Sequence, residues 1–86
     1  MSKKLNHPGI IQHKEWAKDL KDINRRLNQM LLELQDAYGV SSREVTLVLR
    51  TKEELGRLRS RLDSNVIMDN PHLPLHQLTF YYKLGG

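Results

Sequence analysis

The sequence of 86 residues contains no cysteine and no long apolar run. Without cysteine, the chain has neither a disulfide framework nor a thiolate metal site, which suits a reducing compartment. No apolar stretch approaches the roughly 18 residues that a membrane helix needs, and the N-terminus lacks the apolar core of a signal peptide. These absences predict a cytoplasmic protein that does not enter a membrane.

Motifs that carry enzyme chemistry are also missing. The chain has no nucleophile elbow, phosphate loop, paired acid–base constellation or dinucleotide fingerprint. His72 and His76 have the i,i+4 spacing of helical metal ligands, but Pro74 lies between them and disfavours a helix. We therefore expect a protein that is not an enzyme and that holds neither a cofactor nor a metal.

The charge balance is basic but scattered. The net charge is +4, which modestly favours acidic partners such as nucleic acid. Two lysines in residues 1–12, and six basic against four acidic side chains in residues 39–63, account for the excess. Because no block of like charge exists, the chain has no basic nucleic-acid tail.

The length predicts a single domain over residues 1–86. A chain of this size buries only about 60–65% of its unfolded surface, so dimerisation would be a natural way to add buried area. Pro8-Gly9 marks residues 1–12 as a flexible arm. We expect a helical core over 13–63 and a loop followed by a C-terminal strand over 64–86.

Residues 13–38 predict a long amphipathic helix. Apolar residues recur there at alternating spacings of four and three, which is one helix face and also a heptad pattern. The stripe is either the core of the domain or the coiled-coil seam of a homodimer. The candidate oligomer or partner face consists of Trp16, Leu20, Ile23, Leu27, Met30 and Leu34.

A tight turn is predicted at residues 39–41. Gly39 follows the apolar-periodic run and can adopt the left-handed conformation that ends helices. Ser41 lies three residues before Glu44, which is the spacing of a capping box. One helix therefore ends and a new element begins within about three residues.

The element after the turn has two interpretations. Glu44 to Arg50 is rich in β-branched residues, and Val45, Leu47 and Leu49 alternate along it, which is typical of a strand. A second capping box, Thr51 to Glu54, would then begin a second helix over about 51–63. The competing interpretation is one helix from Ser42 onward.

The C-terminal segment predicts a strand over about 77–83. Leu78, Phe80 and Tyr82 alternate there with Thr79 and Tyr81. The expected fold is therefore mainly α with a small C-terminal β element, an α+β domain.

The string YGVSSREVTLVLR, together with the helix before it, resembles the helix-turn-helix motif of DNA-binding regulators over residues 31–50. The resemblance places Gly39 at the turn glycine and directs the start of the second helix into the major groove. It implies that arginine and lysine bind guanine or phosphate, and that serine and threonine bind phosphate or base edges. The candidate nucleic-acid-binding residues are Ser41, Ser42, Arg43, Thr46, Arg50, Lys52, Lys3 and Lys4.

Two functions follow as hypotheses. The first is a small basic DNA-binding protein, a dimeric regulator that uses a helix-turn-helix-like element. The second is a non-enzymatic protein-interaction module, a small adaptor or inhibitor that binds another protein. That module would use the long amphipathic helix or the edge of the C-terminal strand.

Overall fold

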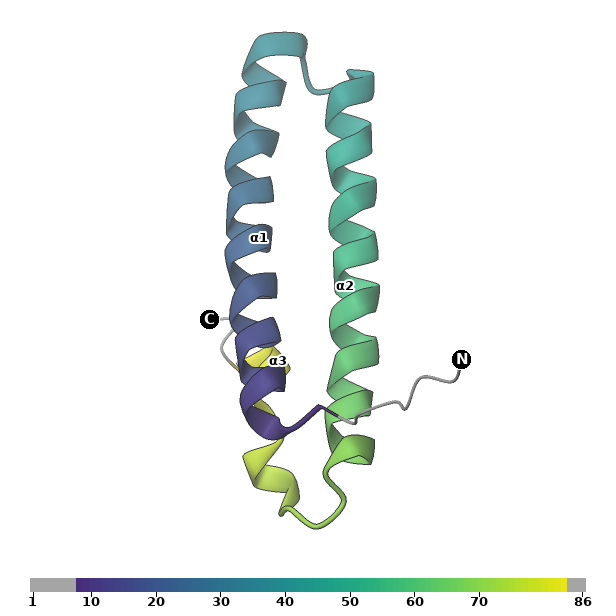
Figure 1. Cartoon of the computed structure of the whole chain (residues 1–86). Coiled ribbons are helices and arrows are strands. Elements are labelled where there is room, and N and C mark those ends of the chain that lie inside the picture. Colours follow the sequence, from purple (N-terminus) through teal and green to yellow (C-terminus); the bar gives the residue numbers. More distant parts are fainter. Residues whose placement is uncertain (1–7, 84–86) are drawn as a thin grey trace, which may run out of the picture.

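The computed structural model describes residues 8–83, which form a helical hairpin closed at one end by a short third helix. Helix α1 (Ile10–Tyr38) and helix α2 (Arg43–Asp69) run antiparallel and lie side by side along their length (Figure 1). A single 3-10 turn, η1 (Leu75–Gln77), and helix α3 (Phe80–Lys83) then bring the chain back against the hairpin. The two long helices are joined at one end by the short turn, and α3 lies near the other.

The predicted turn lies where helix α1 ends. Gly39 has φ +98°, a conformation that glycine adopts without strain, and its N–H donates to the carbonyl of Gln35 at 2.9 Å. Helix α2 is capped by Ser42, whose hydroxyl accepts from the N–H of Val45 at 3.2 Å. The cap is therefore one residue later than the Ser41–Glu44 spacing predicted.

The strand interpretation of residues 44–50 is wrong, and so is a second helix limited to 51–63. Helix α2 is continuous from Arg43 to Asp69. Val45 and Val48 are buried, whereas Leu47 and Leu49 are about half exposed, so burial follows a spacing of three rather than two. The Ser42 cap and the burial of these valines outweigh the weak β preference of the segment.

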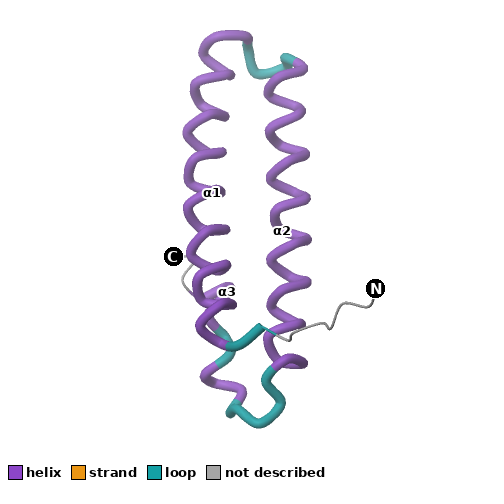
Figure 2. Tube along the Cα trace, in the orientation of Figure 1, coloured by secondary structure: helices purple, strands orange, loops and turns teal. Residues whose placement is uncertain are grey.

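The predicted C-terminal strand over 77–83 is also wrong, and with it the α+β class. Figure 2 shows only helices and loops in the described part of the chain. Consecutive residues Phe80 and Tyr81 are both buried, whereas Tyr82 is exposed, which alternation cannot produce. A strand here would have no neighbouring strand to pair its backbone N–H and C=O groups, because the rest of the described chain is helix and turn. One helical turn instead forms these hydrogen bonds locally.

The core lies at the end of the hairpin away from the turn. It combines residues of all three helices and the η1–α3 junction, namely Ala17, Leu20, Val66, Leu78, Phe80 and Tyr81. Helix α2 ends at Asn70, where the loop that leads to η1 begins. The side-chain amide of Asn70 donates to the carbonyl of Val66 at 3.0 Å. Over residues 8–83, no helix combines the length and the apolar character needed to cross a bilayer.

Candidate interaction surface

One side of the hairpin is covered by α3, and the other side is not. Phe80 of α3 lies 6.0 Å from the ammonium of Lys14, and Tyr82 contacts the hydroxyl of Ser60. An α-helix turns about 100° per residue. Ile23, nine residues after Lys14, therefore lies on the opposite side of α1, and Leu58, two residues before Ser60, lies nearly opposite on α2. Both side chains face away from α3.

The apolar residues on the side of the hairpin that α3 does not cover form a surface that we call the open face. Ile23, Leu47 and Leu58 have exposed fractions of 46%, 48% and 47%. The other members are partly buried. The open face consists of Ile23, Leu27, Met30 and Leu34 of α1 with Leu47 and Leu58 of α2.

The two remaining residues of the predicted partner face have a different role. Leu20 is buried in the core, and Trp16 is half-buried against it. The ring of Trp16 meets the imidazole of His13 edge-on, with 5.3 Å between the ring centroids. The heptad stripe is therefore core at its N-terminal end and open surface over Ile23 to Leu34.

Charged rows of opposite sign border the open face. The helical rotation of 100° per residue places four carboxylates and one arginine on the outer edge of α1, and four arginines and one carboxylate on the outer edge of α2. All ten side chains are exposed. The acidic row is Glu15, Asp19, Asp22, Arg26 and Glu33, and the basic row is Arg43, Arg50, Glu54, Arg57 and Arg61.

Three of the predicted nucleic-acid-binding residues share a surface. Arg43, Thr46 and Arg50 are exposed on the outward side of α2. Ser41 is exposed in the turn, and the Ser42 hydroxyl is engaged as the helix cap. The structure thus brings together the arginines and Thr46, with the serines at the adjacent helix start.

Lys52 does not join this group. Its ammonium reaches across to the side-chain oxygen of Asn28 on α1, so it faces the other helix. Lys3 and Lys4 lie outside the described residues. The helix-turn-helix motif also crosses its two helices at about 90–120°, whereas α1 and α2 lie side by side (Figure 1). DNA binding at this turn stays a prediction.

A buried hydrogen-bonded network that no sequence pattern predicted connects all three helices. His13 is fully buried, with its Nδ1 2.6 Å from the Tyr81 hydroxyl and its Nε2 3.0 Å from a carboxylate oxygen of Asp69. A carboxylate only accepts, so Nε2 of His13 donates to Asp69, and in that tautomer of the uncharged ring Nδ1 accepts a hydrogen bond from the Tyr81 hydroxyl. The network fixes the start of α1, the end of α2 and α3 to one another.

Tyr81 holds its proton more tightly than an ordinary tyrosine. Burial, and next the negative charges of Asp63 and Asp69, raise the pKa of its phenol from 10.0 to about 12. The hydroxyl is therefore protonated at neutral pH and available as the donor to His13.

This shift predicts a loss of stability in alkali. Below pH 10 the Tyr81 phenol is protonated in both the folded and the unfolded chain, and its contribution to the free energy of unfolding is complete. Between pH 10 and about 12 the unfolded chain loses this proton before the folded chain does, so the free energy of unfolding falls. Urea unfolding from pH 9 to 12 should therefore show a steeper loss for the wild type than for Tyr81→Phe. Equal slopes would contradict the assignment.

Only part of this network carries a sequence signal. His13, Ala17, Leu20 and Asn24 are spaced four, three and four residues apart, beside the heptad stripe, and this pattern places His13 on the inner side of α1. Asp69 and Tyr81 are 56 and 68 residues away in sequence. No local pattern pairs them with His13.

Comparison with known proteins adds no assignment. No protein-family model matches the chain, and no curated protein or solved structure shows significant similarity to it. Within residues 8–83, no group of three or more metal-ligating side chains is close enough to hold a metal ion.

Proposed function

We propose that the protein is a non-enzymatic, cytoplasmic interaction module that binds a second copy of itself through the open face, so that two hairpins form a four-helix bundle. The observation that carries this proposal is the half-exposure of Ile23, Leu47 and Leu58 on the side of the hairpin that α3 leaves uncovered. Water around these side chains is released when a second apolar surface covers them. Heptad spacing is the pattern that packs helix against helix.

The size of the surface is adequate for a dimer. Helix α1 has 29 residues, which at 1.5 Å each makes it about 43 Å long. Two helices side by side are about 20 Å wide. The whole side of the hairpin, with its charged borders and the N-terminal part of α1, therefore offers about 800 Å² per copy, which is what a stable protein–protein interface needs.

The charged rows favour a second copy in one orientation. A two-fold axis parallel to the helices places α1 of each copy over α2 of the other, and every neighbouring helix pair is then antiparallel. The acidic row of α1 then lies beside the basic row of the other copy's α2, at both edges of the bundle. Such complementarity sets orientation more than affinity.

The same arrangement aligns the apolar side chains. Asn28 contacts Lys52, and His13 contacts Asp69, so residues whose numbers sum to about 81 lie at the same level of the hairpin. Ile23 and Leu58 therefore lie at one level. Rotation about an axis parallel to the helices keeps that level, so Ile23 of each copy would pack on Leu58 of the other.

A second candidate function is DNA binding by the basic row of α2. The exposed arginines Arg43, Arg50, Arg57 and Arg61 extend along one side of the helix and include two of the predicted nucleic-acid contacts. Counterion release would make such binding fall steeply with salt.

Sedimentation equilibrium distinguishes the two candidates. Interaction through the open face predicts a mass of twice the 10.1 kDa of one chain, retained at 0.5 M salt because apolar burial dominates it. A monomer at all concentrations up to 100 μM would overturn the proposal. With the protein at low salt, labelled duplex DNA should sediment at the mass of DNA alone. Sedimentation of the DNA together with the protein, lost in Arg43→Ala, would favour the second candidate.

A further inference from the structure

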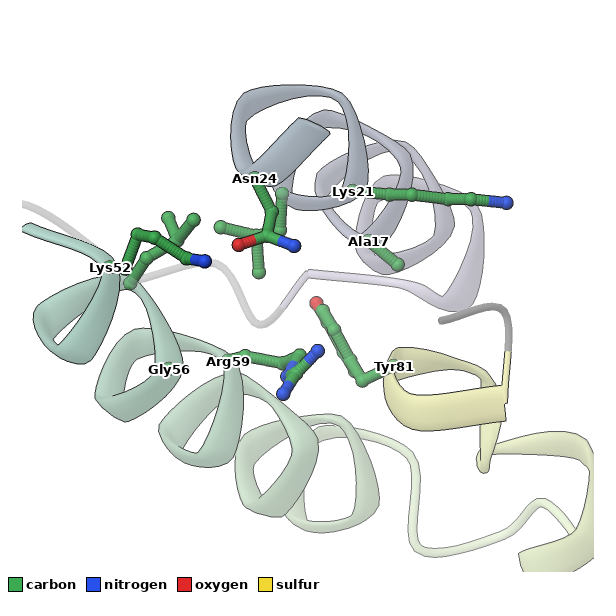
Figure 3. Close-up of a pocket in the computed structure, with 9 residues that line it drawn as sticks. Ala17, Lys21, Asn24, Lys52, Gly56, Arg59 and Tyr81 are labelled. Atoms are coloured by element: carbon green, nitrogen blue, oxygen red, sulfur yellow. The ribbon is translucent and has the colours of Figure 1, made fainter. Parts of the chain in front are cut away.

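A small pocket lies between the three helices, on the side of the hairpin opposite the open face. It has a volume of about 120 Å³ and is lined by residues of α1, α2 and α3. In Figure 3, Asn24 points into it from α1, Arg59 and Lys52 from α2, and the ring of Tyr81 closes it from α3. Since a cavity needs only about 10–15 Å³ to hold one water, the pocket can accommodate a group of several heavy atoms.

Arg59 is held at this pocket without an anionic partner. Its guanidinium carbon lies 4.5 Å from the ring centroid of Tyr82, a cation–π contact that fixes its direction. Its Nε is shielded from solvent and has no hydrogen-bond partner within residues 8–83. A shielded N–H of a charged group without an acceptor is unusual, because its desolvation is uncompensated.

The rest of the lining is cationic or neutral. Lys52 contributes a second positive charge, and Lys21 lies at the rim with its ammonium directed away from the cavity. Among the described residues that line the pocket, none is acidic. Asp63 and Asp69, whose charges act on Tyr81, are not part of the lining.

We propose that this pocket binds a small tetrahedral oxyanion, a phosphate group, between Arg59, Lys52 and Asn24. Arginine donates to phosphate through adjacent N–H groups in a fixed plane. The lysine adds charge, and the Asn24 amide adds a neutral donor. The volume of the pocket is sufficient for a phosphate group.

The bound anion would also reinforce the fold. Because α3 contributes Tyr81 to the lining, the pocket is complete only when α3 is docked on the hairpin. Ligand binding to the folded state alone stabilises it by mass action. The proposal is independent of self-association, since the open face lies on the other side of the hairpin.

The Arg59 Nε–H resonance reports directly on this site. Titration of the ¹⁵N-labelled full chain with inorganic phosphate, at ionic strength held constant with chloride, should shift that resonance in a saturable manner. Arg59→Gln should weaken binding about tenfold or more, because it removes a charge-assisted donor pair. Lys52→Met should weaken it to a smaller extent, and the dispersed amide spectrum of each variant verifies its fold.

Arg61→Gln is the matched control, because Arg61 is exposed on the basic row of the same helix. It should leave the phosphate affinity unchanged. Equal, non-saturating shifts at all arginines would overturn the proposal, and so would an unchanged affinity in Arg59→Gln. Acetate is the comparison for carboxylate ligands, and binding of acetate more tightly than phosphate would contradict the tetrahedral assignment.

Discussion

Replacement of His13 by alanine is expected to lower the free energy of unfolding by about 3–5 kcal/mol. His13 is fully buried and makes two side-chain hydrogen bonds, to Tyr81 and Asp69. The substitution leaves a cavity and removes the acceptor of a buried phenol and the donor to a carboxylate. Chains of this length have total stabilities near the low end of about 5–15 kcal/mol, so the variant should be close to unfolding at room temperature.

Urea unfolding followed by circular dichroism measures this loss. His76→Ala is the matched control, because His76 is exposed, and it should change the stability by less than about 0.5 kcal/mol. His13→Gln retains one donor and part of the volume, so its stability should lie between those of the wild type and the alanine variant. If His13→Ala and His76→Ala had the same stability, the network would not hold the three helices together.

Replacement of Ile23 by glutamate is expected to abolish the proposed dimerisation at micromolar concentrations. A two-fold interface contains this position twice, so each dimer would bury two unpaired carboxylates. At roughly 1.5 kcal/mol for each, the dissociation constant should rise about a hundredfold or more. Because Ile23 is half exposed in one chain, the fold of the monomer should survive the substitution.

Leu32→Glu is the matched control for this experiment. Leu32 is also an exposed apolar residue of α1, nine residues after Ile23 and therefore on the opposite side of the helix. Light scattering after gel filtration should give the dimer mass for Leu32→Glu and the monomer mass for Ile23→Glu. Equal masses for the two variants would show that the open face is not the interface.

The elements with a strong local signal were predictable from the sequence. The heptad stripe of residues 13–38 lies on one helix, and the φ of +98° at Gly39 is the reason that the turn falls there. The strand predicted for residues 44–50 is wrong because a β-branched segment between turn signals has the composition of a strand, although here it lies in helix α2. Its burial depends on the rest of the hairpin, which composition does not encode, whereas the Ser42 cap is local and lies one residue beyond the predicted position.

The candidate surface was predictable only in part. The stripe indicates which residues are apolar, but not that α3 covers one side of the hairpin and leaves Ile23 and Leu58 on the other. That distinction depends on the return of residues 70–83 to the hairpin, where Leu78 and Tyr81 become buried. The alternation in this segment predicted a strand with Phe80 and Tyr82 on one face, whereas the helical turn buries Phe80 with Tyr81 and leaves Tyr82 exposed.

The most direct test of self-association through the open face is an isotope-filtered NOE spectrum of mixed labelled and unlabelled chains. The proposed bundle predicts contacts between the methyl groups of Ile23 in one copy and those of Leu58 in the other. Contacts from Leu32 to the second copy are not expected. A spectrum without intermolecular contacts at a concentration of 1 mM would contradict the account, and so would intermolecular contacts confined to Leu32 and its side of α1.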